Sequence, residues 1–247
     1  MIQATPRTFA DLVGWPRYTP TDEQAVHGTT VLSLRYDQGV LVLADRRATM
    51  GNLVMYERAD KVFPLDDTLV MAISGSFARS LEICRFLRHS LKYYRRMALH
   101  DMSLEGKLME VSRALAGNLP AAMNGVGVFI PIVAAYDPAH DRFEQFFFDG
   151  AGARFENGGY ACAGSGSERI RGVFEYLSRT KGAWDARPLE EVLTDGLTML
   201  DIAADLDSAT GGFAKVLPSA RILTREGNRP VSMDMLEAAA RAVLSQS

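Results

Sequence analysis

The chain has little cysteine, no long apolar run and no excess of either charge. Its two cysteines, Cys84 and Cys162, are too few for a disulfide framework, and neither has metal-ligand spacing with a histidine. We therefore expect small buried thiols, a reducing cytoplasm and no metal site. No window holds 18 uninterrupted apolar residues, and the first residues lack a basic region followed by an apolar core, so we expect neither a membrane span nor a secretory signal. The net charge of -3 gives no indication of a nucleic-acid surface.

The composition is typical of a globular protein, and it changes in character near residue 28. Residues 1–28 hold three of the ten prolines and show little periodicity, which indicates a loosely ordered extension. This extension is either a plain disordered tail or a propeptide that is removed. No linker follows it, so we expect a single domain over residues 29–247.

The rest of the chain alternates short β-rich runs with amphipathic helical patterns. Turn residues such as those at 37–39, 66–67 and 137–138 separate the runs and predict antiparallel pairs. The predicted strands cover residues 29–35, 40–44, 61–64, 68–73, 126–136, 143–148, 160–163 and 220–224, with an extended stretch at 46–55. The predicted helices cover residues 77–97, 103–119, 166–179, 189–206 and 232–245, the first with Ser76 as its N-cap. Buried strands between helices predict an α+β fold, a four-layer αββα sandwich of two antiparallel sheets covered by helices.

A threonine that follows a glycine at this boundary carries the strongest chemical signal. Cleavage of the Gly28–Thr29 bond would give Thr29 a free amine beside its own hydroxyl, so that a weak nucleophile carries its own base. Asp45 ends one predicted strand and Lys61 begins another, 16 and 32 residues beyond Thr29. A lysine near the threonine would favour loss of the hydroxyl proton, and a carboxylate would hold that lysine in place. The alternative is that Asp45 and Lys61 form a surface ion pair.

Three glycine- or hydroxyl-rich turns have two interpretations each. Gly75 lies between a strand and a helix, where unpaired backbone N–H groups could stabilise an oxyanion, although such junctions are also ordinary loop punctuation. Residues 164–167 form a glycine–serine turn before a helix, which could cradle a phosphate but lacks the lysine of a P-loop. Residues 207–212 are rich in hydroxyls and could be only a helix terminus and loop.

Taken together, these motifs resemble the β-subunit of the 20S proteasome, particularly the actinobacterial type, an N-terminal nucleophile hydrolase. The resemblance covers Gly28 to at least Arg225. Its motifs are Gly28-Thr29-Thr30, Ala44-Asp45-Arg46-Arg47-Ala48-Thr49, Lys61, Ser74-Gly75-Ser76, Gly164-Ser165-Gly166-Ser167 and the segment from Asp207 to Gly212. The extension is short for this group. The Asp45-Arg46-Arg47 run differs from the Asp-Gly-Gln type of the related protease HslV, which counts against that relative.

The resemblance implies a role for each matching residue. Thr29 would be the nucleophile, freed by autocatalytic cleavage after Gly28, and the remaining catalytic residues would be Asp45, Lys61, Gly75, Ser165, Asp207 and Thr210. Among these, Asp45 and Lys61 would be the charged partners and Gly75 the oxyanion amide. Thr210 falls where many members have serine.

The same resemblance implies how substrate binds. Thr49 would pair with the substrate backbone, strand to strand. Ala48, Ala59, Ile73 and Phe77 would line the specificity pocket, and because all four are apolar we expect cleavage after large hydrophobic residues. These four residues could also simply pack the core.

The function implied is a threonine-type endopeptidase that degrades unfolded proteins inside a sealed compartment, without a cofactor. Its partners would be other β-subunits in a heptameric ring, α-subunit rings, and indirectly an ATPase ring that delivers tagged substrates. Two other functions stay open: a non-catalytic scaffold subunit, and an HslV-like or small-molecule amidase with the same fold.

Overall fold

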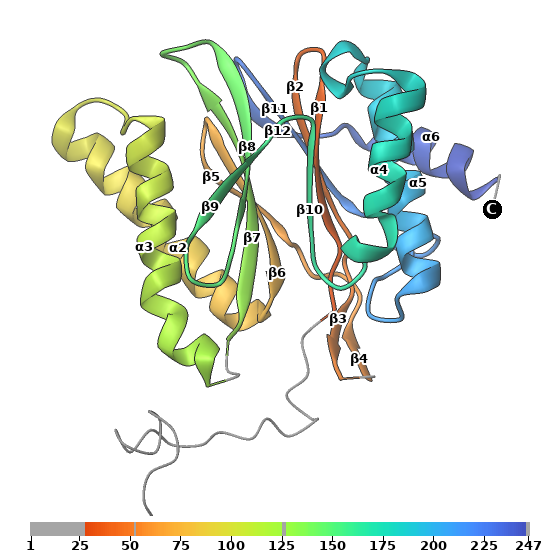
Figure 1. Ribbon diagram of the computed structural model, residues 1–247, viewed down its shortest axis with the longest axis horizontal. Coiled ribbons are helices and arrows are strands. Elements are labelled where there is room, and N and C mark those ends of the chain that lie inside the picture. The colour runs from red at the N-terminus through yellow and green to blue at the C-terminus, as the bar shows by residue number, and fades with distance from the viewer. Residues whose placement is uncertain (1–27, 52, 125–126, 246–247) are drawn as a thin grey trace, which may run out of the picture.

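A computed structural model describes residues 28–51, 53–124 and 127–245. The proposed propeptide, apart from Gly28, lies outside the described residues. Figure 1 shows two sheets packed face to face, with helices on both outer sides. None of the helices in the described part of the chain is long and apolar enough to cross a membrane.

The first sheet is antiparallel and has the strand order β10-β1-β2-β11-β12. The bounds of its strands are β1 Val31–Tyr36, β2 Gly39–Ala44, β10 Tyr160–Ala163, β11 Ser219–Thr224 and β12 Gly227–Pro230. Its outer face is covered by α4 Ser167–Lys181, α5 Leu189–Leu206 and α6 Met233–Leu244, with a 3₁₀ turn at Trp184–Ala186.

The second sheet is also antiparallel, with the order β5-β6-β7-β8-β9. Its strands are β5 Val62–Asp66, β6 Leu69–Gly75, β7 Phe129–Asp137, β8 Arg142–Phe148 and β9 Arg154–Asn157. Two helices cover its outer face, α2 Phe77–Ala98 and α3 Leu104–Met123. A short ribbon of β3 Ala48–Met50 and β4 Leu53–Tyr56 extends from one end of the sandwich.

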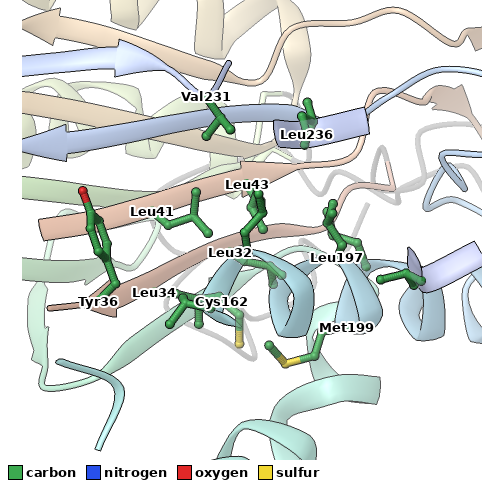
Figure 2. Packing of buried hydrophobic residues seen from close by; sticks show 14 of the residues in the cluster. Leu32, Leu34, Tyr36, Leu41, Leu43, Cys162, Leu197, Met199, Val231 and Leu236 are labelled. Carbon is green, nitrogen blue, oxygen red and sulfur yellow. The ribbon is translucent and has the colours of Figure 1, made fainter. Parts of the chain in front are cut away.

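Three apolar layers hold the sandwich together. One lies between the first sheet and α4–α6, where alternate residues of β1 and β2, such as Leu32, Leu34, Leu41 and Leu43, meet the helices (Figure 2). The opposite faces of the same strands, including Val31 and small residues of β2, pack against the second sheet. The third layer joins the second sheet to α2 and α3. Both faces of each sheet are thus buried, which confirms the predicted four-layer α+β fold.

Most predicted elements are confirmed, with a few corrections. The strands β9 and β12 were not predicted, because Arg154–Asn157 is largely exposed and polar and Gly227–Pro230 contains glycine and proline. Helix α3 continues to Met123 beyond Pro120, whose carbonyl accepts a 2.8 Å hydrogen bond from the Asn124 side chain. The predicted start of β7 at residue 126 lies outside the described residues, and the strand begins at Phe129.

The N-cap prediction for α2 is confirmed in its position but not in its hydrogen bond. Ser76 occupies the N-cap position, but its side chain makes no capping hydrogen bond. Its backbone N–H instead donates to the Val128 carbonyl at 2.7 Å, and the Ser80 hydroxyl donates to the Ser76 carbonyl. This strand-to-helix junction is therefore fixed by Val128, the residue just before β7, rather than by a serine cap.

Candidate active site

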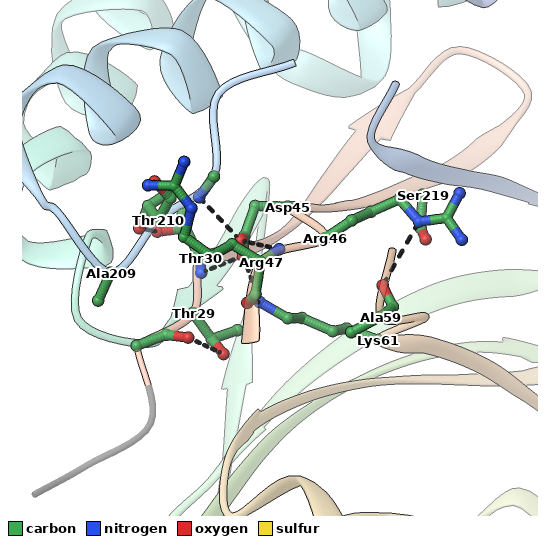
Figure 3. Close-up of polar contacts among 12 residues, drawn as sticks. Thr29, Thr30, Asp45, Arg46, Arg47, Ala59, Lys61, Ala209, Thr210 and Ser219 are labelled. Atoms are coloured by element: carbon green, nitrogen blue, oxygen red, sulfur yellow. Dashed lines mark hydrogen bonds and ion pairs between the residues drawn. The ribbon is translucent and has the colours of Figure 1, made fainter. Parts of the chain in front are cut away.

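Thr29 lies just before β1, at the end of the sandwich from which the β3–β4 ribbon extends (Figures 1 and 3). Its side chain is buried, and its Oγ1 donates to the Gly28 carbonyl at 2.7 Å. The Gly28 N–H donates to the Thr49 Oγ1 at 3.2 Å, which fixes the residue before Thr29 against β3. The threonine oxygen is thereby held beside the carbonyl of the bond that the sequence marks for cleavage.

Glycine is required at positions around this threonine because backbones approach closely there. A Cβ at Gly28 would lie 1.7 Å from the Ala209 Cβ, and one at Gly164 would lie 1.9 Å from the Thr29 carbonyl oxygen. Gly164 also has a φ of +98°, which disfavours other residues. These glycines allow three segments distant in sequence to meet at Thr29.

Asp45 and Lys61 form a buried ion pair directly beside Thr29. The Lys61 Nζ donates to the Asp45 Oδ1 at 2.7 Å and to the Arg47 carbonyl at 2.6 Å. Their side chains are 0% and 2% exposed, for Asp45 and Lys61 respectively, so the alternative of a surface ion pair is wrong. Burial lowers the pKa of Lys61, while the Asp45 carboxylate opposes this shift. The lysine therefore loses its proton more readily than an exposed lysine.

Asp45 is held by three backbone N–H groups as well as by Lys61. Its Oδ1 accepts from the Thr30 N–H at 2.8 Å, and its Oδ2 accepts from the Arg47 and Gly211 N–H groups at 2.9 and 3.0 Å (Figure 3). These donors come from three different segments of the chain. The carboxylate thus joins the start of β1 to the end of β2 and to the loop after α5.

A second polar cluster lies on the other side of the Thr29 backbone. The Asp207 Oδ2 accepts from the Ser165 hydroxyl at 2.5 Å and from the Thr210 hydroxyl at 2.6 Å. The Thr29 N–H donates to the Ser165 Oγ at 3.4 Å. The hydroxyls of Thr210 and Thr30 are also paired, at 2.7 Å. The structure therefore brings Ser165, Asp207 and Thr210 together beside the Thr29 nitrogen.

Gly75 ends β6 opposite Phe129, with a φ of +97°. A Cβ at this position would lie 2.3 Å from the Val128 carbonyl oxygen, so the position requires glycine. A small cavity of about 20 Å³ connects it to Thr29. The cavity is lined by Gly28, Thr29, Arg47, Ala48, Lys61, Ile73, Gly75 and Phe77.

The predicted substrate-binding residues are only partly together. Ala48, Ile73 and Phe77 line the small cavity with Thr29. Ala59 is buried and its backbone is bonded to Arg46, but it is not among the residues that line this cavity. Thr49 is buried in β3 with its hydroxyl on the Gly28 N–H.

Sequence reasoning missed three residues that hold the site together. Thr30 and Gly211 each donate a backbone N–H to Asp45. Arg47 accepts from Lys61 through its carbonyl, and its guanidinium donates to the carbonyls of Ser208 and Thr210 at 3.0 and 3.2 Å. Because all three bind the Asp45–Lys61 pair through backbone atoms, residue type gave no signal of their part in the site.

Comparison with known proteins identifies the family. A family model described as proteasome subunit matches residues 25–217, well over half of the chain. The chain belongs to the proteasome subunit family. Proteasome subunit beta of Streptomyces griseus subsp. griseus is 34% identical over 226 residues, covering 90% of this chain and 78% of the relative. That of Gordonia bronchialis is 34% identical over 251 residues, covering 98% and 82%. That of Streptosporangium roseum is 35% identical over 230 residues, covering 92% and 79%.

These relatives agree with the predicted resemblance to actinobacterial β-subunits. The match to the proteasome subunit model begins four residues before Thr29 and continues through the turn at 207–212. All the segments that surround Thr29 therefore lie within the part of the chain that defines the family.

Proposed function

We propose that this proteasome subunit is a catalytic β-subunit of a 20S proteasome, a threonine peptidase that hydrolyses peptide bonds of unfolded proteins. The observation that supports it best is the placement of the Thr29 hydroxyl. Its oxygen lies 2.7 Å from the Gly28 carbonyl oxygen, inside a cluster that contains a buried Asp45–Lys61 pair. A nucleophile, a charged pair and a scissile bond thus share one site.

The same geometry supports removal of residues 1–28 by self-cleavage. The Thr29 Oγ attacks the Gly28 carbonyl carbon, and the bond between that carbon and the Thr29 nitrogen breaks as an ester forms. Water then hydrolyses the ester, which releases residues 1–28 as an acid and leaves Thr29 with a free amine. The amine stays beside Ser165, whose Oγ already accepts from the Thr29 N–H.

In the mature subunit, each polar cluster would have a different task. The Asp45 carboxylate holds Lys61 in place and favours its charged form against the effect of burial, and this ammonium favours loss of the Thr29 hydroxyl proton. The Thr29 amine, with an ordinary pKa near 8, is the base that takes this proton and returns it to the leaving amine. Ser165, Asp207 and Thr210 would orient that amine. The N–H of Gly75 would stabilise the oxyanion.

We also propose cleavage after large hydrophobic residues. Ala48, Ile73 and Phe77 give the cavity beside Thr29 an apolar wall. At about 20 Å³ it is too small for a large side chain while Gly28 forms part of its lining, and departure of Gly28 would enlarge it. Thr49, in the β3–β4 ribbon, would pair with the substrate backbone.

Family membership implies a multi-subunit proteasome barrel. We propose heptameric β-rings, stacked against α-rings and supplied by an ATPase ring, in the cytoplasm. This places the peptidase site inside a closed chamber.

Intact-mass measurement of the purified, assembled particle tests the proposal. We expect the wild-type subunit to begin at Thr29, and Thr29→Ala to retain residues 1–28, because alanine has no nucleophile. Thr29→Ser is the matched control, which keeps a hydroxyl and should still be processed. An uncleaved wild-type chain in an assembled particle would contradict the mechanism.

A fluorogenic peptide with a large hydrophobic residue before the dye distinguishes a catalytic subunit from a scaffold subunit and from a small-molecule amidase. A catalytic subunit cleaves it in the wild-type particle and not in Thr29→Ala. A processed particle that leaves it intact would point to a small-molecule amidase, and an unprocessed inactive one to a scaffold subunit.

A further inference from the structure

A second cavity opens beside Thr29 on the side of the Ser165 hydroxyl. Its volume is about 360 Å³, and Gly75 and Ser165 are among its lining residues. Gly75 also lines the small cavity that contains Ile73 and Phe77, so the two cavities meet at this glycine. Thr29 therefore lies between a small apolar cavity and a much larger one.

The larger cavity continues away from Thr29 between the two sheets. It shares Phe147, Cys162 and Arg171 with a further cavity of about 600 Å³, which extends along β10 to Trp184. The two together form a groove between β8 and the first turns of α4. We call this the β8–α4 groove.

The position of the base decides which part of a substrate would lie in this groove. The Thr29 amine must return a proton to the leaving amine of the substrate, so the leaving amine has to lie beside it. The Thr29 nitrogen lies against Ser165, which is where the groove begins. The acyl side of the substrate corresponds to Gly28, which lines the small cavity. The β8–α4 groove is thus on the leaving side.

Arg171 is the cation at the point where the two parts of the groove meet. It is exposed, and among the described residues it takes part in none of the ion pairs. Its helical neighbours Glu168 and Glu175 also line the groove, and the Glu175 carboxylate is bonded to the Tyr160 hydroxyl at 2.9 Å. The Arg171 charge also reaches the groove wall, since it opposes the raised pKa of Cys162.

We infer that the β8–α4 groove binds the polypeptide segment on the carboxyl side of the cut, and that Arg171 selects an acidic residue there. This rests on the proposed peptidase function. Arg171 is four residues into α4, about 6 Å along the helix from its first residue. Ser165, whose Oγ accepts from the Thr29 N–H, lies two residues before α4, so the path from the cut to Arg171 is this short turn plus that length of helix. An extended substrate advances about 3.3 Å per residue, so this path corresponds to the second or third residue after the cut.

Paired internally quenched peptides test the charge selection. Both peptides carry the same hydrophobic residue before the cut, and they differ only in glutamate or lysine at the second and third positions after it. We expect the wild-type particle to cleave the glutamate peptide with a kcat/KM about two- to fivefold higher, as suits a solvent-exposed ion pair. Arg171→Glu should reverse the ratio of the two kcat/KM values, so that the lysine peptide is cleaved faster. Glu168→Gln should raise the ratio further in favour of the glutamate peptide.

The ratio of the two peptides removes any effect common to both, such as partial misfolding. Arg169→Glu is the matched control, because this exposed arginine is on the same turn of α4 but does not line the groove. It should leave the ratio unchanged. An equal ratio in wild type and Arg171→Glu, with both peptides cleaved, would overturn the inference while leaving the peptidase function intact. Cleavage of neither peptide would instead contradict the peptidase function.

A groove-filling variant tests the path of the chain without relying on charge. Gly158 lines the far part of the groove, and a Cβ there would meet no atom within 4 Å. Gly158→Trp should slow the cleavage of peptides that have five residues after the cut. We expect this rate to fall about fivefold or more relative to the rate for a peptide that has only a dye amide after the cut. Gly172→Trp, equally open but outside the groove, is the control. The same relative rates in both variants would show that substrate leaves by another path.

Discussion

The two polar clusters that flank Thr29 differ in charge, burial and the kind of groups that hold them. The Asp45 cluster is a buried ion pair whose carboxylate is fixed by three backbone N–H groups. The Asp207 cluster consists mainly of hydroxyls on a partly exposed carboxylate, with Ser165 exposed. Backbone donors cannot reorient without moving the chain, whereas hydroxyls rotate.

This difference indicates two functions. The Asp45 cluster both joins separate segments and holds a charged lysine, so stability and chemistry depend on the same atoms. In the proposed self-cleavage, the Asp207 cluster would follow the Thr29 nitrogen as it changes from an amide to a free amine. A fixed cluster and an adaptable cluster together suit the proposed sequence of self-cleavage followed by hydrolysis of other chains.

Replacing Asp45 should have the largest effect on both stability and activity, because it disrupts the rigid Asp45 cluster. Asp45→Asn puts an amide NH₂ against N–H donors and leaves Lys61 without its buried counter-charge. We expect a loss of about 3–5 kcal/mol of unfolding free energy, and a fall in kcat of at least about 100-fold. Chemical denaturation and peptide kinetics measure these.

The double variant Asp45→Asn/Lys61→Met is the control for this prediction. It removes the unpaired buried charge, so it should recover part of the stability but none of the activity. If the single variant were as stable as wild type, the ion pair would not hold these segments together.

Replacing Asp207 should affect activity more than stability. Asp207→Asn removes a charge that is only partly buried, and its amide oxygen can still accept from Ser165 and Thr210. We expect less than about 1 kcal/mol of destabilisation. The fall in kcat should be about tenfold, below that for loss of a proton-transfer group. A stability loss equal to that of Asp45→Asn would remove the contrast between the two clusters.

The smallest effect on activity is expected at Thr210, whose side chain is fully buried. Thr210→Ser keeps the hydroxyl that bonds Asp207 and Thr30 and removes one methyl group. We expect kcat within about threefold of wild type and a stability loss of about 1 kcal/mol, measured by thermal unfolding and kinetics. Thr210→Val, which keeps the shape and loses the hydroxyl, should cost about 1–3 kcal/mol and reduce kcat further.

Helices and strands could be predicted from the sequence wherever a local residue pattern marks them. The helix at Leu189–Leu206 and the strand at Tyr160–Ala163 were predicted to the residue, because apolar periodicity and flanking glycines mark them. The polar edge strand β9 and the strand β12 carry no such pattern. The junction at Ser76 shows the same limit, since its serine favours a side-chain cap but the Val128 carbonyl, just before β7, accepts the bond that fixes it.

The sequence by itself determined the four-layer fold class and the residue types of the candidate site, and it predicts the Gly28–Thr29 boundary. These follow from local pattern and from motifs at family spacing. Only the tertiary structure decided that the Asp45–Lys61 pair is buried, that Thr30, Arg47 and Gly211 hold it, and that Thr29 lies between a small cavity and the β8–α4 groove. Burial and backbone hydrogen bonds arise only when distant segments meet in the folded chain. The residue types of any one segment therefore do not reveal these contacts.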